Sequence, residues 1–137
     1  MDGSADFAYL LIRVLSCGVW LAAGLYKAFH FDQTAAEMTE LGIPMASVAL
    51  VPVLIMELLG SAMMIADQFV WVISIAWILF MIPATAIYHA RFMIAGGTIN
   101  FPQMVQVSKN VSIAGGLLAL IILDPSAPGW LGALLLG

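Results

Sequence analysis

The sequence predicts an all-α integral membrane protein: a four-transmembrane-helix bundle with a short interfacial helix between the first two spans. Of its 137 residues, 64% are hydrophobic and only 9% are charged, and the mean hydropathy is +1.09. A soluble domain of this size cannot hide so much apolar surface, so lipid is the expected solvent. Because hydrocarbon offers the backbone no hydrogen bonds, each spanning segment is expected to be a helix. We therefore expect a single membrane domain over residues 1–137.

Four apolar segments are long enough to cross a bilayer, which takes about 20 residues per helix. They are residues 7–29, 45–66, 69–91 and 104–123. Between the first two, Thr34 and Glu37 have the spacing of a capping box, and Gly42 and Pro44 form a plausible helix stop. This pattern predicts the short interfacial helix.

The charge and the single cysteine narrow the functional classes. Eight acidic and four basic residues give a formal charge of −4, which argues against a nucleic-acid partner. Cys17 is the one cysteine, so an internal disulfide and a CxxC dithiol are excluded. The N-terminus is acidic and its first base is Arg13, so no cleaved signal peptide is expected. The distribution of the bases favours an orientation with both termini outside the cytoplasm.

Four ionisable side chains fall inside the predicted spans, where charges are rare and mark candidate functional sites. They are Arg13, Glu57, His89 and Lys109. Glu57 lies near the middle of its span, and a carboxylate there is expected to pair or to protonate. Arg13 is the predicted partner because its estimated depth is similar. The pair is either a structural ion pair or a proton relay, and both interpretations stay open.

Further polar residues are expected near one membrane face. Thr85 and His89 are one helical turn apart, and Lys109 and Asn110 open the fourth span. Together with Lys27 they are the candidates for binding a ligand such as a quinone, because clustered positive charge attracts an oxygen acceptor. No residue is assigned a catalytic role beyond the possible relay.

No tightly bound cofactor is expected. Ligation of a haem by His30 and His89 is disfavoured, because His30 is expected at the membrane interface. No metal-binding, phosphate-binding or nucleophile motif is present in the sequence.

Several short motifs occur in an ordered series along most of the chain, about residues 9–123. They are Gly24-Leu25-Tyr26-Lys27, Leu41-Gly42-Ile43-Pro44, Glu57-Leu58-Leu59-Gly60, Ala84-Thr85-Ala86-Ile87-Tyr88-His89, and Lys109-Asn110 before Ala114-Gly115-Gly116. With Arg13 ahead of them, these motifs make the chain resemble the DoxX family of small membrane proteins.

The resemblance implies a four-span protein of a prokaryotic cytoplasmic membrane that is associated with quinone-linked oxidoreductases. It also implies an accessory subunit that supports a membrane or peripheral redox partner, rather than a complete enzyme. The family's polar positions correspond to Arg13, Lys27, Glu57, His89, Lys109 and Asn110. Two alternatives remain: a purely structural assembly subunit, and a small-solute or proton transporter. Self-association into a homo-oligomer is compatible with each.

Overall fold

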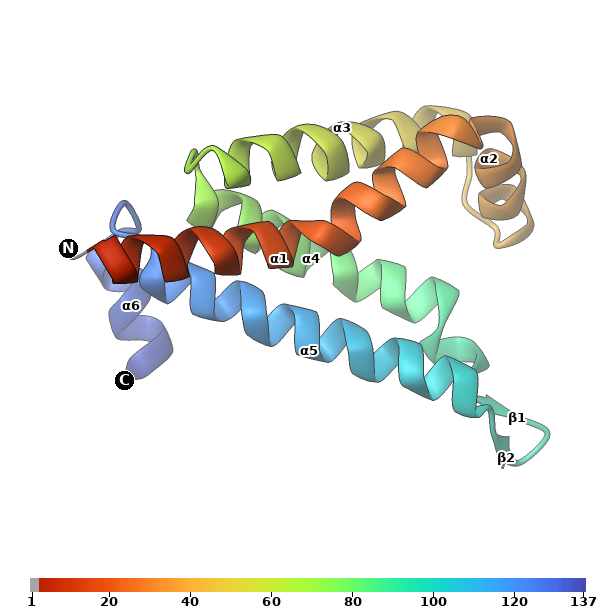
Figure 1. Cartoon of the computed structure of the whole chain (residues 1–137). Helices are drawn as coiled ribbons and strands as arrows, with labels where there is room; N and C mark the ends of the chain where they lie inside the picture. Colours follow the sequence, from red (N-terminus) through yellow and green to blue (C-terminus); the bar gives the residue numbers. More distant parts are fainter. Residues whose placement is uncertain (1–2) are drawn as a thin grey trace. The chain divides into compact units, whose positions relative to one another are not determined.

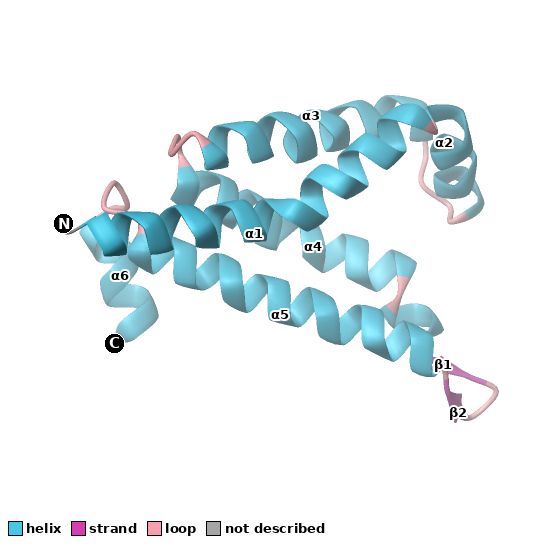
Figure 2. Cartoon of the chain, in the orientation of Figure 1, coloured by secondary structure: helices cyan, strands magenta, loops and turns pink. Residues whose placement is uncertain are grey.

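Four long helices dominate the computed structural model, which describes residues 3–137 (Figures 1 and 2). They are α1 (Gly3–Phe29), α3 (Ala46–Ile65), α4 (Val70–Tyr88) and α5 (Phe101–Leu123). All four are long and apolar enough to cross a membrane. The short helix α2 (Phe31–Glu40) lies between the first two of these in the chain. The predicted class, four spans with a short helix between the first two, is confirmed.

The remaining elements are small. They are a 3₁₀ turn η1 (Ala90–Phe92), a two-stranded antiparallel hairpin of β1 (Ile94–Ala95) and β2 (Thr98–Ile99), and the C-terminal helix α6 (Gly129–Leu136). The chain divides into two compact units, Met1–Val70 and Trp71–Gly137. Each unit is described separately below.

In the first unit, α1 packs along α3, and α2 packs on α3 at the end where α1 finishes (Figure 1). Cys17 and Trp20 of α1 and Leu50 and Met64 of α3 are among its buried side chains. The two helices approach closely at Gly24, where an added Cβ would lie 2.8 Å from the Leu58 Cδ2 atom. A larger residue at this crossing would therefore require Leu58 or one of the two helices to shift.

Helix α2 begins four residues earlier than the capping-box pattern indicated, because that pattern placed the N-cap at Thr34. His30 holds the N-cap position without a side-chain cap bond, and Thr34 is buried inside the helix. The capping prediction was wrong because α1 leads into α2 with only His30 between them. The predicted stop is correct: Gly42 has φ +86°, and the Ile43 N–H donates to the Met38 carbonyl at 3.0 Å.

The same kind of ending closes α3, but with an aspartate in place of glycine. Asp67 has φ +62°, and the Gln68 N–H donates to the Met63 carbonyl at 2.8 Å. Aspartate tolerates this left-handed conformation better than most residues. The turn thereby places an acidic side chain at the end of α3.

In the second unit, α5 begins at Phe101 rather than at residue 104. The Asn100 side chain accepts a hydrogen bond from the Gln103 N–H at 3.5 Å, and Pro102 occupies the first turn. Before it, Gly96 and Gly97 both have positive φ, as the tip of a tight hairpin requires. Helix α4 ends at Tyr88, earlier than predicted, because η1 replaces its expected last turn.

Asp124 joins the other ends of α4 and α5. One carboxylate oxygen accepts the Trp71 N–H at 2.9 Å, and the other accepts the Ser126 N–H at 2.8 Å. The Trp71 N–H lies in the first turn of α4, where no backbone carbonyl of the helix can reach it. A buried carboxylate there also complements the positive end of the helix dipole. Asp124 thus serves as a cap supplied from a distant part of the chain.

Candidate functional site

Two ion pairs connect α1 to the α3 region of the first unit. The Lys27 ammonium lies 2.6 Å from Oε1 and 2.8 Å from Oε2 of Glu57. The Arg13 Nη1 atom lies 2.9 Å from Oδ1 of Asp67. The predicted Arg13–Glu57 pair is therefore wrong. Positions 13 and 27 of one helix are about 21 Å apart along its axis, so a carboxylate that meets one base cannot meet the other.

The Lys27–Glu57 pair is the more deeply buried of the two. Glu57 is 2% exposed and the Lys27 side chain is 25% exposed. Gly24 precedes Lys27 by one turn and faces the Glu57 Cβ, so the close helix crossing and the ion pair belong to one arrangement. A buried pair of this kind contributes little net stability, but removing one partner leaves a charge without compensation.

Arg13 is also buried, although its acidic partner is not. Its Nη1 donates to the Met64 carbonyl at 3.3 Å, and its guanidinium lies 4.7 Å from the centre of the Tyr9 ring. Asp67, in contrast, lies in the turn after α3 and has a half-exposed side chain. Between the two ion pairs, the Cys17 thiol donates to the Ser61 carbonyl at 3.6 Å. The first unit therefore carries polar contacts at three levels between α1 and the α3 region, with apolar side chains between them.

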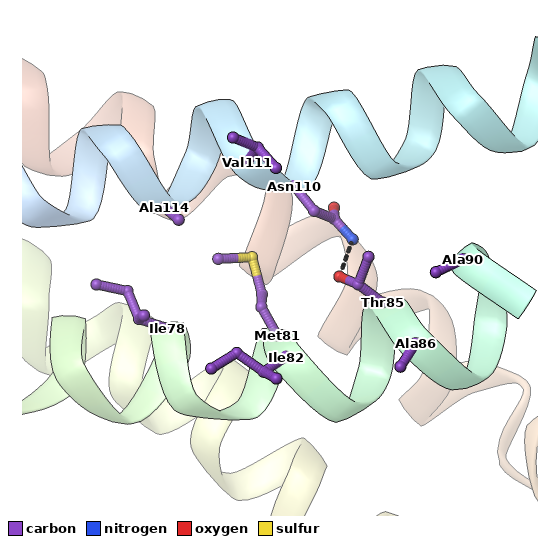
Figure 3. Close-up of a pocket in the computed structure, with 9 residues that line it drawn as sticks. All are labelled: Ile78, Met81, Ile82, Thr85, Ala86, Ala90, Asn110, Val111 and Ala114. Carbon is purple, nitrogen blue, oxygen red and sulfur yellow. Dashed lines mark hydrogen bonds between the residues drawn. The ribbon is translucent and has the colours of Figure 1, made fainter. Parts of the chain in front are cut away.

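The second unit contains a pocket of about 290 Å³ between α4 and α5 (Figure 3). Its walls are Ile78, Met81, Ile82, Thr85, Ala86, Ala90, Asn110, Val111 and Ala114. All are apolar except Thr85 and Asn110, which lie together toward the η1 end of the pocket (Figure 3). Ligand pockets in proteins typically combine apolar walls with a few convergent polar groups.

The two polar groups are hydrogen-bonded to each other across the helices. The Asn110 Nδ2 atom donates to the Thr85 Oγ1 atom at 2.8 Å (Figure 3). This bond uses one acceptor site of the hydroxyl and leaves its hydrogen to donate elsewhere. The pair can therefore offer an O–H donor and an amide to a ligand while it holds α4 to α5.

His89 forms a second link between α4 and α5 near the same end. Its Nδ1 donates to the Gln103 side-chain oxygen at 2.8 Å. Gln103 was not among the predicted site residues. The polar spacing of Gln103, Gln106 and Asn110 in α5, three and then four positions, could have revealed it, because such residues share one helical face.

Three of the predicted ligand-binding residues do not line this pocket: His89, which is bonded to Gln103, Lys109 and Lys27. Lys109 is exposed and donates to the side-chain oxygen of Gln106, in its own helix, at 2.6 Å. Lys27 belongs to the first unit, where Glu57 holds its ammonium. The predicted polar set is therefore divided, and only Thr85 and Asn110 form part of the pocket wall.

The remaining histidine lies apart from these contacts. His30 is exposed, stacks on Tyr26 with ring centres 4.3 Å apart, and donates from Nδ1 to the Tyr26 carbonyl. Among residues 3–137, no three His, Cys, Asp or Glu side chains gather closely enough to form a metal-binding group.

Four apolar spans with polar contacts inside them define a small multi-pass membrane protein. The family described as DoxX matches residues 8–90, more than half of the sequence, and the chain belongs to this family. It is also similar to the inner membrane protein YphA of Escherichia coli (strain K12), with 30% identity over 126 residues. That match covers 91% of this chain and 89% of YphA. No solved structure matches the chain.

These similarities confirm the predicted family and a multi-pass location in a prokaryotic cytoplasmic membrane. The matched family region includes both ion pairs, Thr85 and His89, and it ends before α5. The partner of Thr85 in the pocket, Asn110, therefore lies outside it.

Proposed function

We propose that this DoxX protein is an accessory membrane subunit of a quinone-linked electron-transfer complex, where it anchors or supports a partner oxidoreductase. The observation that carries the proposal is the α4–α5 pocket, whose apolar wall is interrupted by the Thr85–Asn110 pair. The association of DoxX proteins with redox systems, which the family resemblance implies, supports the same conclusion.

The pocket suits the chemistry of a quinone headgroup. A quinone has an apolar ring and carbonyl oxygens that accept hydrogen bonds, and the Thr85 hydroxyl and the Asn110 amide are donors. A volume of about 290 Å³ is just below the range of most ligand pockets, roughly 300–1,000 Å³, and fits a ring better than a large cofactor. Electron transfer would be the work of the partner and the quinone, while this chain binds and orients the ring.

A second candidate function is a structural subunit that only supports assembly of a larger membrane complex. The two ion pairs of the first unit favour it, because they connect α1 to the α3 region at two separate levels and none of their four residues lines the pocket. Charges of this kind can specify helix register without taking part in chemistry. Transport of a small solute or of protons is a third and weaker alternative.

The first experiment is purification of the tagged protein from its native membrane in a gentle detergent. Copurifying proteins are identified and quantified by mass spectrometry, and bound quinone is measured by solvent extraction. The proposal predicts a stoichiometric oxidoreductase or cytochrome, together with quinone. Recovery with a non-redox assembly would favour the structural subunit, and recovery alone would contradict both subunit functions.

A pair of variants separates the two subunit functions. Thr85→Val combined with Asn110→Leu removes both polar groups of the pocket, whereas Ser112→Ala removes an exposed hydroxyl from the same helix. The proposal predicts an assembled complex in both cases, with bound quinone and quinone-dependent turnover lost only in the double variant. Unchanged turnover in the double variant, with normal assembly, would reject the proposal.

A further inference from the structure

The connection between α4 and α5 exposes an apolar face outside the pocket and the ion pairs. In the hairpin, Ile94 of β1 lies directly opposite Ile99 of β2. Directly opposed residues in an antiparallel pair point to the same face, so the two side chains form one patch. Ile94 is 64% exposed and Ile99 is 67% exposed.

Aromatic residues flank this patch on both sides. Phe101, the first residue of α5, is 65% exposed, and Phe92 is also exposed. In water, such a patch would be unfavourable, and a two-stranded hairpin this short has little stability of its own. Its apolar residues therefore require a covering surface.

The position of the hairpin in the chain identifies that surface. Helices α4 and α5 are both long and apolar enough to span a membrane. The segment that connects two consecutive spans must turn at a membrane face, and only twelve residues, 89–100, separate these two. The patch is therefore expected to lie at the boundary between the headgroups and the acyl chains.

The positive charge of this segment also suits the headgroup boundary of a membrane. Residues 68–123 contain no aspartate or glutamate, and with Arg91 and Lys109 this part of the sequence carries a net positive charge. The Arg91 guanidinium lies 4.6 Å from the centre of the Phe92 ring, and both residues shortly precede Ile94 in the chain. A guanidinium next to aromatic and aliphatic side chains matches the arrangement of a lipid phosphate above its acyl chains.

We propose that the face formed by Ile94 and Ile99 inserts into the headgroup boundary of an anionic phospholipid bilayer, with Arg91 binding lipid phosphate. This surface is an interfacial anchor for the α4–α5 connection. The inference is independent of the proposed redox function, since it concerns only how this connection meets the lipid.

The test is the depth of a spin label attached at single cysteines in the full-length protein. Ile94→Cys and Ile99→Cys are labelled in a Cys17→Ala background and reconstituted in phosphatidylcholine vesicles with and without phosphatidylglycerol. Thr98→Cys is the matched control, because Thr98 precedes Ile99 in β2 and points to the opposite face. Should Cys17→Ala fail to fold, the native background serves, since Cys17 is fully buried.

The collision rate of the label is measured with two reagents: oxygen, which concentrates in lipid, and a nickel chelate, which stays in water. We expect labels at positions 94 and 99 to favour oxygen several-fold over the label at position 98. With Arg91→Gln, the label at position 99 should become shallower, and more so in anionic vesicles than in neutral ones, because choline balances the phosphate charge of phosphatidylcholine. An unchanged depth in anionic vesicles would overturn the phosphate contact.

Equal exposure of positions 98 and 99 to the nickel chelate in vesicles would overturn insertion. A label at position 99 that is exposed in vesicles of the purified protein but protected in native membranes would also overturn it. In that case a partner protein would cover the patch instead.

Discussion

The two units of this protein connect their membrane helices by different physical means. In the first unit, α1 is held to α3 by charges, with Glu57 almost fully enclosed beside Lys27. In the second, α4 and α5 are linked by neutral side chains between Thr85 and Asn110 and by a carboxylate that caps a helix end. The pocket lies in the second unit, beside the neutral Thr85–Asn110 link.

This difference indicates a division of roles. A buried ion pair tolerates little movement, because any separation leaves a charge in a medium of low dielectric constant. A hydrogen bond between an amide and a hydroxyl costs less to rearrange and can be exchanged for a bond to a ligand. Under the proposed function, the first unit holds a fixed helix register and the second binds the ligand.

The largest expected effect comes from breaking the buried ion pair. Lys27→Met leaves the Glu57 carboxylate without a counter-charge, which should lower the free energy of unfolding by about 3–5 kcal/mol, and by less where water reaches the site. Reversible unfolding in mixed detergent micelles measures this loss. The double variant Lys27→Met with Glu57→Gln should recover most of the stability. No recovery would mean that the pair is not the source of the effect.

A smaller effect is expected at the helix crossing of the first unit. Gly24→Ala places a Cβ 2.8 Å from Leu58 Cδ2, so α1 and α3 must separate or Leu58 must move, at roughly 1–3 kcal/mol. Gly18→Ala, in the same helix, is the control because its Cβ would meet nothing within 4 Å. The same unfolding measurement applies. Equal stability of the two variants would contradict the close crossing.

In the second unit, the cap on α4 should contribute less than the buried ion pair. Asp124→Ala removes the acceptor for the Trp71 N–H and should cost about 0.5–2 kcal/mol. The exposed Glu40→Ala serves as the control and should change little. Backbone hydrogen exchange should increase at the first turn of α4 in the Asp124 variant. An unaltered exchange rate there would argue against the cap.

The smallest effect on stability is expected at the pocket. Thr85→Val breaks one hydrogen bond to Asn110, and its expected cost is about 0.5–1.5 kcal/mol. A double-mutant cycle with Asn110→Leu should give a coupling of similar size. If the pocket binds quinone, these variants should lose bound quinone out of proportion to their small loss of stability. A large loss of stability without loss of bound quinone would instead show that the Thr85–Asn110 bond fixes the helices and does not serve ligand binding.

The sequence by itself determined the class of the protein, the number of spans and most of the helix ends. The spans could be recognised because hydropathy over about 20 residues is a local property of the sequence. The end of α2 could be recognised because glycine and proline favour the backbone conformations that end a helix, as Gly42 and Pro44 do here. The motifs around Glu57 and Thr85 likewise identified the family, which the comparisons confirmed.

Only the tertiary structure decided which polar residues meet. Arg13 and Lys27 are both plausible partners for Glu57 until the register of α1 against α3 is known, and the close approach at Gly24 sets that register. The roles of Gln103 and Asp124 were also missed, because each contacts a residue that is distant in the chain. Pairing depends on distances between helices, and helix period and hydropathy describe each helix only by itself.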